Sequence, residues 1–206
     1  MGLRRIVGGV AIFLPSSLIT WSWLNGVGIY PSISAYYYSD MRDIFVGSLL
    51  VIGTFLLAYK GYDKSGQEWL SDRALSLLAG ASVIIVALLP TDTGPPTLFG
   101  NIHLGAAGVF LAAIGAISYF KFSRCADPGR KILFKALGAA TLACLALLAA
   151  GIFLLDPNSF PAWAENWVFW LESVAVWAFG IAWLIKGETL AATRHLGKQF
   201  FGRKPG

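Results

Sequence analysis

Glu172 is the most unusual side chain in the sequence, because it interrupts an apolar stretch that covers residues 163–186. A carboxylate that faced lipid at this depth would cost roughly 2.5 kcal/mol or more, so we expect Glu172 to face the interior of a helix bundle. Glu165 comes almost two helical turns earlier, so both carboxylates are expected on one helix face, lining one cleft. A carboxyl group that is hydrogen-bonded to a neighbouring helix for packing alone is the alternative for Glu172.

Three further side chains could form a catalytic site with Glu172. His103 is predicted in the first turn of a helix, whose N-terminus favours the neutral imidazole that acts as a base or a metal ligand. Asp92 ends the apolar segment before it, and Asp43 begins another. We predict catalytic roles for Asp43, Asp92, His103 and Glu172, either around a divalent metal that activates water or as a proton relay. Neither HExxH nor GxSxG is present, so the identity of any cofactor stays open.

The densest group of polar side chains in the sequence covers residues 32–43. Arg42 offers a planar guanidinium suited to a phosphate or carboxylate, and the tyrosines offer hydroxyls and ring faces at headgroup depth. An ion pair between Arg42 and Asp40, with Asp43 at a helix N-terminus, is the alternative. The residues predicted to bind substrate are Arg42, Ser34, Tyr37, Tyr38 and Glu165.

The elements that must position these side chains are membrane-spanning helices. The sequence is 56% hydrophobic and only 13% charged, which leaves too little polar surface for a soluble globule. Six apolar stretches reach the length that a bilayer core requires. They cover residues 5–25, 43–60, 72–90, 103–121, 131–155 and 163–186. The predicted fold class is therefore an all-α polytopic membrane protein with six transmembrane helices.

The basic residues predict the orientation of the chain. Of the 16 Lys and Arg residues, only Arg42 falls in a connection on the side opposite to all the others. Because basic residues gather on the cytoplasmic side, both termini are predicted to be cytoplasmic. The net charge of +5 is then a topology signal, and we expect no nucleic-acid partner. A multi-pass protein of the cell membrane, by default the bacterial inner membrane, is the expected localisation.

The chain is expected to form two regions. Residues 1–186 form the six-helix transmembrane domain, and residues 187–206 form a basic cytoplasmic tail. Aromatic and basic residues interleave in this tail, so it either lies on the inner membrane surface or is a disordered basic segment.

Capping residues are predicted before three of the helices. Ser39 or Asp40 precedes the second span, Ser71 or Asp72 precedes the third, and Asn101 precedes the fourth. Each can accept a hydrogen bond from an otherwise unpaired backbone amide.

Two segments resemble a known group of proteins: SISAYYYSDMRDIFVGSLLVIGTFLLAYKGY at residues 32–62 and VFWLESVAVWAFGIAWLIKGE at residues 168–188. With ALLPT at residues 87–91 and His103, they resemble small bacterial six-span proteins of unknown function. That group is in turn distantly similar to the FRAG/DRAM/SFK-type membrane proteins. Some eukaryotic members are linked to remodelling the lipid of glycosylphosphatidylinositol anchors, others to autophagy or to lipid organisation in the plasma membrane.

The resemblance implies an all-helical six-span protein whose natural ligand is a lipid. The residues that it nominates are Ser32, Ser34, Arg42, Asp43, His103 and Glu172. The sequence lacks the His-x-x-x-His pair of the alkaline ceramidase and adiponectin receptor type of hydrolase. That zinc chemistry is therefore in doubt for this chain.

The function expected from these observations is that of a lipid-interacting membrane protein with an outward-facing polar cleft. Whether it is an enzyme stays open; a lipid-modifying hydrolase or transferase would fit the predicted residues. A small proton-coupled transporter or channel that uses Glu172, or a non-catalytic membrane scaffold, are the alternatives. The expected partner is a membrane lipid, and the oligomeric state is undetermined.

Overall fold

The structure, a computed structural model, describes residues 2–61, 71–124, 126–155 and 165–201; of residues 188–201 it describes only the backbone. These parts of the chain form helices and no strand. The elements are α1 (Leu3–Leu24), η1 (Ser34–Tyr38), α2 (Arg42–Ala58), α3 (Asp72–Leu88), α4 (Leu98–Ala116), η2 (Ile117–Phe122), α5 (Pro128–Leu154) and α6 (Trp167–Phe201). η1 is a 3-10 helix, and η2 is a π-helix that continues α4.

Four of the helices are long and apolar enough to cross a membrane. They are Leu3–Leu24, Leu98–Phe122, Pro128–Leu154 and Trp167–Gly187. Both α2 and α3 have 17 residues, which corresponds to about 25 Å against a hydrocarbon core of about 30 Å. All six predicted helices are present, but only four of them meet the length expected for a span.

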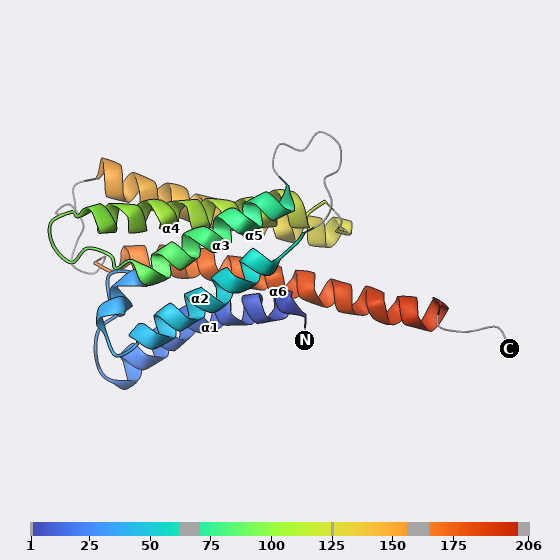
Figure 1. Cartoon of the computed structure of the whole chain (residues 1–206), viewed down its shortest axis with the longest axis horizontal. Helices are drawn as coiled ribbons and strands as arrows, with labels where there is room; N and C mark the ends of the chain where they lie inside the picture. The colour runs from blue at the N-terminus through green and yellow to red at the C-terminus, as the bar shows by residue number, and fades with distance from the viewer. Residues whose placement is uncertain (1, 62–70, 125, 156–164, 202–206) are drawn as a thin grey trace.

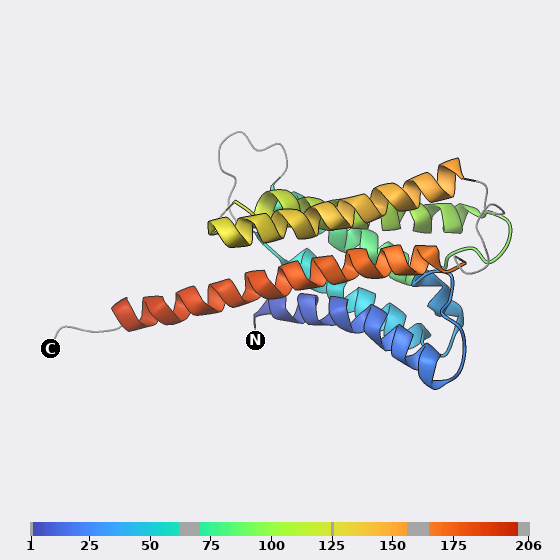
Figure 2. The ribbon, with the colours of Figure 1, turned by 180° about the vertical axis from the view of Figure 1, so that it is seen from behind.

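The helices form a closed ring in chain order. Each helix packs against the next one along the chain, and α6 packs against α1, so the first and last helices are neighbours. Figures 1 and 2 show this arrangement from opposite sides. The α1–α6 contact depends on glycine: a Cβ added at Gly8 would lie 2.7 Å from the Gly180 carbonyl oxygen. Such small residues let two helix backbones approach closely.

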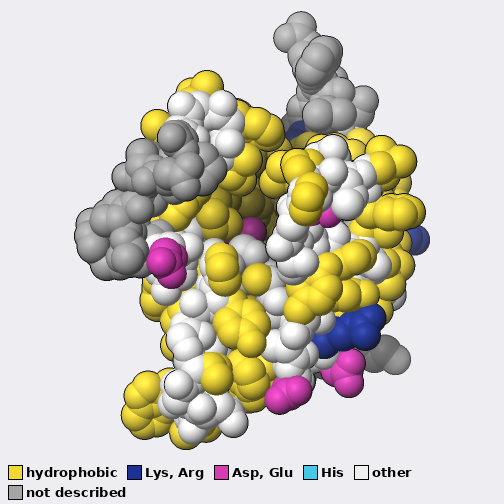
Figure 3. Space-filling view, turned by 90° about the vertical axis from the view of Figure 1, so that its left-hand side faces the viewer, with side chains coloured by type: hydrophobic (Ala, Val, Ile, Leu, Met, Phe, Trp, Pro, Cys, Tyr) yellow, Lys and Arg dark blue, Asp and Glu magenta, His cyan; other side chains and the backbone are white. Residues whose placement is uncertain are grey.

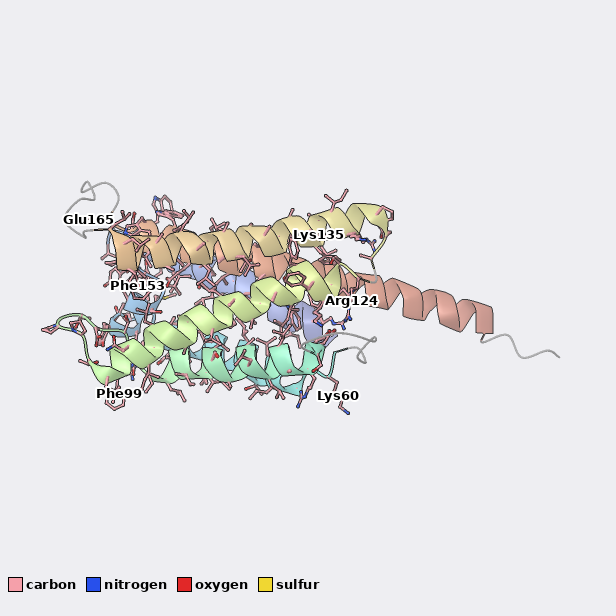
Figure 4. The ribbon with its side chains drawn as sticks, turned by 90° about the horizontal axis from the view of Figure 1, so that it is seen from above. Lys60, Phe99, Arg124, Lys135, Phe153 and Glu165 are labelled. Carbon is pink, nitrogen blue, oxygen red and sulfur yellow. The ribbon has the colours of Figure 1, made fainter. Side chains whose placement is uncertain are left out.

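The ring has two ends with different composition. We call the end that carries residues 25–41 and 89–97 the Ser34 end, and the end where the chain begins and α6 leaves the bundle the Arg4 end (Figures 1 and 2). Figure 4 shows Lys60, Arg124 and Lys135 towards the Arg4 end, and Phe99, Phe153 and Glu165 at the Ser34 end. The charge asymmetry predicted from the sequence is therefore an asymmetry between the two ends of the fold.

Several basic side chains of the Arg4 end are buried. Asp72 is only 2% exposed and accepts from Arg124 at 2.9 Å, with Lys121 at 3.8 Å. The guanidinium of Arg4 donates to the Tyr59 hydroxyl at 2.7 Å. Lys186 donates to the Phe122 carbonyl oxygen at 3.2 Å. These residues, expected in connections, thus pack into the end of the bundle.

An aromatic cluster fills the ring next to these charges. The Trp183 ring is fully buried, with its centroid 5.1 Å from that of Tyr59, 5.4 Å from that of Phe122 and 5.5 Å from that of Phe179. Phe110 of α4 packs edge-on against Phe179 at 6.2 Å. Side chains from α4, α6, η2 and the end of α2 therefore close the ring towards the Arg4 end.

Of the three predicted helix caps, one is confirmed and two differ. The Ser71 cap of α3 is present, with its hydroxyl accepting from the Ala74 amide at 3.0 Å. The α4 helix begins at Leu98 and is capped by Thr97 rather than Asn101, so His103 lies in its second turn and the argument from the helix N-terminus loses force. The N-cap of α2 is Met41, which makes no side-chain cap.

The sixth helix also differs from its predicted range. It begins at Trp167, so Glu165 precedes the helix and the prediction that it shares a helix face with Glu172 is wrong. Its backbone continues as helix to Phe201, well past the predicted end of the span at residue 186. Residues 202–206 of the predicted tail lie outside the described residues.

Candidate functional site

His103 is the centre of a buried hydrogen-bond chain at the Ser34 end. Its side chain is 4% exposed, and both ring nitrogens have partners. The Nδ1 atom lies 2.7 Å from the Leu89 carbonyl oxygen, which follows α3, and Nε2 lies 2.9 Å from the Ser34 hydroxyl oxygen at the start of η1. The ring thereby joins α4 to two segments that are remote in the sequence.

Glu172 approaches the same turn from α6. Its Oε2 atom accepts a hydrogen bond of 2.7 Å from the backbone amide of Ile33, the residue that precedes Ser34. The Phe169 amide, one turn earlier on α6, donates to the Pro31 carbonyl oxygen at 2.9 Å. Glu172 therefore faces the bundle, as the sequence predicts, and it holds the turn that carries Ser34.

The second carboxyl oxygen of Glu172 remains open to a ligand. Oε1 has no hydrogen-bond partner among the described residues. It also does not belong to the unpartnered polar atoms that are sealed from solvent within them. The carboxyl group thus makes one hydrogen bond within the fold and can accept another from outside it.

Tyrosines fix the same loop from its other side. The Tyr38 hydroxyl donates to the Thr91 carbonyl oxygen at 2.8 Å, which ties the η1 loop to the α3–α4 connection. Tyr36 is fully buried, and its hydroxyl lies 2.6 Å from that of Ser22 in α1. The loop around Ser34 is therefore held by α1, α4, α6 and the α3–α4 connection together.

Asp92 lies near this group, but its hydrogen bonds are with Thr97, the residue that caps α4. Its carboxylate accepts from the Thr97 hydroxyl at 2.7 Å and from the Thr97 amide at 3.0 Å. These two hydrogen bonds, with a smaller contribution from the nearby His103 ring, hold the pKa of Asp92 below its ordinary value. A Cβ added at Gly100 would overlap the carboxylate, so glycine is required there. Asp92 thus has a structural role at the helix start.

Arg42 lies on the rim of the Ser34 end. Its guanidinium stacks over the Tyr37 ring at 4.4 Å and donates to the Tyr37 hydroxyl at 2.7 Å. It is exposed, and so are Asp40 and Asp43; within the described part of the chain no ion pair joins these three side chains. The predicted pair of Arg42 with Asp40 is therefore absent, and Asp43 does not reach His103 or Glu172.

The described side chains do not form the divalent metal site that was one of the two alternatives for Asp43, Asp92, His103 and Glu172. In residues 2–61, 71–124, 126–155 and 165–187 no three His, Cys, Asp or Glu side chains are placed to hold a metal ion. Glu165 is exposed at the Ser34 end (Figure 4). Of the nine predicted site residues, the structure brings Ser34, His103 and Glu172 to one turn and places Tyr38 against the neighbouring connection.

A hollow opens at the Ser34 end. Figure 3 views this end directly and shows apolar side chains around an opening with an acidic side chain at its floor. Lys and Arg side chains are seen at the edge of this face, with acidic side chains beside them, and not in the opening. The hollow is therefore largely apolar, with a polar group inside.

Comparisons with protein-family models, with curated proteins and with solved structures found no match.

Sequence reasoning missed the backbone groups that organise the site. The Ile33 amide and the Leu89 carbonyl are hydrogen-bond partners of Glu172 and His103, yet any residue type supplies such groups. One signal was available: Pro90 directly follows Leu89, and Pro31 precedes the Ser34 turn. Proline favours an irregular backbone, whose carbonyl groups need partners outside a helix.

Proposed function

We propose that this protein is an integral membrane protein that binds a membrane lipid, with the polar head of the lipid in the hollow at the Ser34 end. The observation that carries the proposal is the environment of Glu172. A carboxyl group within an apolar helix is costly, and among the described residues Glu172 makes only one hydrogen bond. The open oxygen of Glu172 provides the contact for the lipid head.

The ligand chemistry follows from the groups around the hollow. An oxygen of a carboxyl group accepts a hydrogen bond from a hydroxyl or an ammonium group. Both occur in phospholipid heads, as in phosphatidylglycerol and phosphatidylethanolamine. The apolar side chains around the opening suit the upper part of an acyl chain (Figure 3). The resemblance of residues 32–62 and 168–188 to FRAG/DRAM/SFK-type proteins favours the same class of ligand.

The proposed topology has six spans with both termini in the cytoplasm, in a bacterial inner membrane. Because α2 and α3 lie in the ring between helices that are long enough to cross, they would cross with them. The positive-inside rule assigns the Arg4 end to the cytoplasm. The hollow then opens outward, at the depth of the outer headgroups.

The aromatic cluster favours a one-sided binding site over a transport route. Trp183 lies 11 residues after Glu172, about 16 Å further along α6, and its ring is fully buried. The rings of Phe122 and Phe179 pack against Trp183, and the ring of Phe110 packs against Phe179. A solute that reached Glu172 would meet this packed cluster before it reached the Arg4 end.

Photocrosslinking in lipid vesicles tests the proposal. The full chain is reconstituted with a small share of phosphatidylethanolamine or phosphatidylglycerol that carries a diazirine near its head. We expect crosslinks in residues 28–41 and 167–176. Glu172→Gln keeps an oxygen for the Ile33 amide but replaces the other oxygen with an NH2 group, which cannot accept a hydrogen bond. We therefore expect about 10-fold less crosslinking there, which corresponds to the loss of one hydrogen bond.

Asp43→Asn is the matched control, because it removes an exposed carboxylate from the same end without touching the Glu172 contacts. It should leave the crosslinks unchanged. Crosslinks spread evenly over the outer faces of the helices, and equal in wild type and Glu172→Gln, would rule out the lipid site.

A further inference from the structure

The hydrogen bonds of His103 define its tautomer. A carbonyl oxygen only accepts, so the Nδ1 atom at 2.7 Å from the Leu89 oxygen carries the proton. In the neutral ring, Nε2 then has a free lone pair, and Ser34 donates its hydroxyl proton to it at 2.9 Å. The serine hydroxyl is thereby polarised by a base whose orientation is fixed by its other nitrogen.

This arrangement is that of an activated nucleophile. A nucleophile bonded to a base, with the base held in turn by a third group, is the geometry that hydrolases of unrelated folds share. Here the Leu89 carbonyl takes the place that a carboxylate has in a Ser-His-Asp triad. The Ser34 backbone N–H has no acceptor among the described residues. It can therefore donate to an oxyanion that forms on a group attacked by its own hydroxyl.

We infer that Ser34 and His103 form a catalytic dyad that cleaves a carboxylic ester of a membrane lipid. The inference rests on the proposed lipid site, because the Glu172 contact at Ile33 places the polar part of the lipid next to Ser34. The ester bonds of a glycerolipid lie just below its head, at the depth of a group beside that contact.

The reaction needs no reactant besides the ester and water. The Ser34 oxygen attacks the ester carbonyl carbon while its proton passes to His103 Nε2. The C–O bond to the lipid alcohol then breaks, and the alcohol leaves with the proton from Nε2. Water next gives a proton to Nε2 and attacks the acyl-serine carbon. The fatty acid leaves, and the proton returns to the Ser34 oxygen.

A long-chain alkyl fluorophosphonate tests the dyad, because it phosphonylates an activated serine with loss of fluoride. The full chain is treated in micelles, and the modified peptide is identified by mass spectrometry. We expect an adduct on Ser34, none in Ser34→Ala, and labelling that is about 100-fold slower or more in His103→Gln, which lacks the base. Ser17→Ala is the matched control: its hydroxyl donates to the Leu14 carbonyl oxygen within α1 and makes no hydrogen bond to His103, so this variant should label at the wild-type rate.

The lipid crosslinking experiment on Ser34→Ala separates the two proposals and reports folding of the variant. Crosslinks in residues 28–41 with no fluorophosphonate adduct on wild-type Ser34 would overturn the dyad and leave lipid binding in place. An adduct on Ser32 or Ser39 instead of Ser34 would also overturn it. Loss of crosslinking in the wild type would overturn lipid binding, and the dyad with it.

Discussion

At the scale of single residues, the hydrogen bonds of Asp92 indicate a structural role, whereas the sequence suggests a catalytic one. Its position beside His103 is typical of a catalytic acid, but its two hydrogen bonds go to Thr97. The Thr97 hydroxyl in turn accepts from the Gly100 amide at 3.0 Å. The ionised Asp92 is therefore part of the structure that begins α4.

This role of Asp92 predicts a pH dependence of stability. Its pKa is lowered in the folded protein, chiefly by the Thr97 side-chain hydrogen bond, so the ionised form favours the folded state. The stabilisation is complete above the unfolded value of about 4 and is lost as the pH falls through the lowered pKa. Thermal unfolding in detergent between pH 7 and pH 2.5 should show this loss.

The control is Asp92→Asn, which cannot titrate. The difference in melting temperature between wild type and this variant should shrink below pH 4 and disappear at the lowest pH. A difference that stays constant over the whole range would show that the charge of Asp92 does not stabilise the helix start.

Residue types predicted the candidate side chains better than their partners. Glu172 and His103 stand out because a carboxyl group and a single imidazole are rare in apolar helices, so both could be found in the sequence. Their partners are backbone groups of Ile33 and Leu89, which have no sequence signature. The Glu165 prediction was wrong for a related reason: it assumed that the helix extends back to residue 163, whereas α6 begins at Trp167.

At the scale of elements, helix positions were predictable because each of the six helices overlaps one long apolar stretch of the sequence, although only four of them are long and apolar enough to cross a membrane. The ends of the helices were less predictable. Thr97 and Asn101 are both favourable N-cap residues, and the sequence alone does not show at which of them the backbone becomes helical. The order of packing around the ring was not predictable, since it depends on which small residues face each other. Gly8 and Gly180 show this at the α1–α6 contact.

Two neighbouring glycines of α1 test that contact. Gly8→Ala would place a Cβ 2.7 Å from the Gly180 carbonyl oxygen, so the helices must separate, at a cost of about 1–3 kcal/mol. At Gly9 an added Cβ has nothing within 4 Å, so Gly9→Ala should be neutral or stabilise the helix by about 0.5–1 kcal/mol. Thermal unfolding in the same detergent compares the two. Equal melting temperatures would contradict the close approach of α1 and α6.

At the scale of the whole molecule, the ring combines a hollow at one end with an aromatic and charged closure at the other. In the proposed function the two ends have different roles: the hollow receives the lipid head, and the aromatic closure separates it from the Arg4 end. In the proposed orientation, ligands reach the site from outside the cell.

Cysteine labelling tests this orientation. Cys125 and Cys144 are first replaced by alanine, and a single cysteine is then introduced as Thr93→Cys or Gly129→Cys. Thr93 is exposed at the Ser34 end, and Gly129 is exposed at the Arg4 end. A membrane-impermeant maleimide should modify position 93 in intact spheroplasts and position 129 only after the membrane is opened. The reverse pattern would show that the Arg4 end faces outward. Labelling of both positions in intact spheroplasts would contradict a bundle that spans the membrane.

Because α1 packs against α6, the site can form only after α6 has been synthesised. The hydrogen bond between Ile33 and Glu172 joins residues 139 positions apart, and α6 is made after the other five described helices. The turn that carries Ser34 is therefore synthesised well before Glu172, which can bind the Ile33 amide only once α6 has been made. A nascent chain that stops before α6 therefore already carries Ser34 and His103 but lacks the carboxyl group that joins the two ends of the sequence.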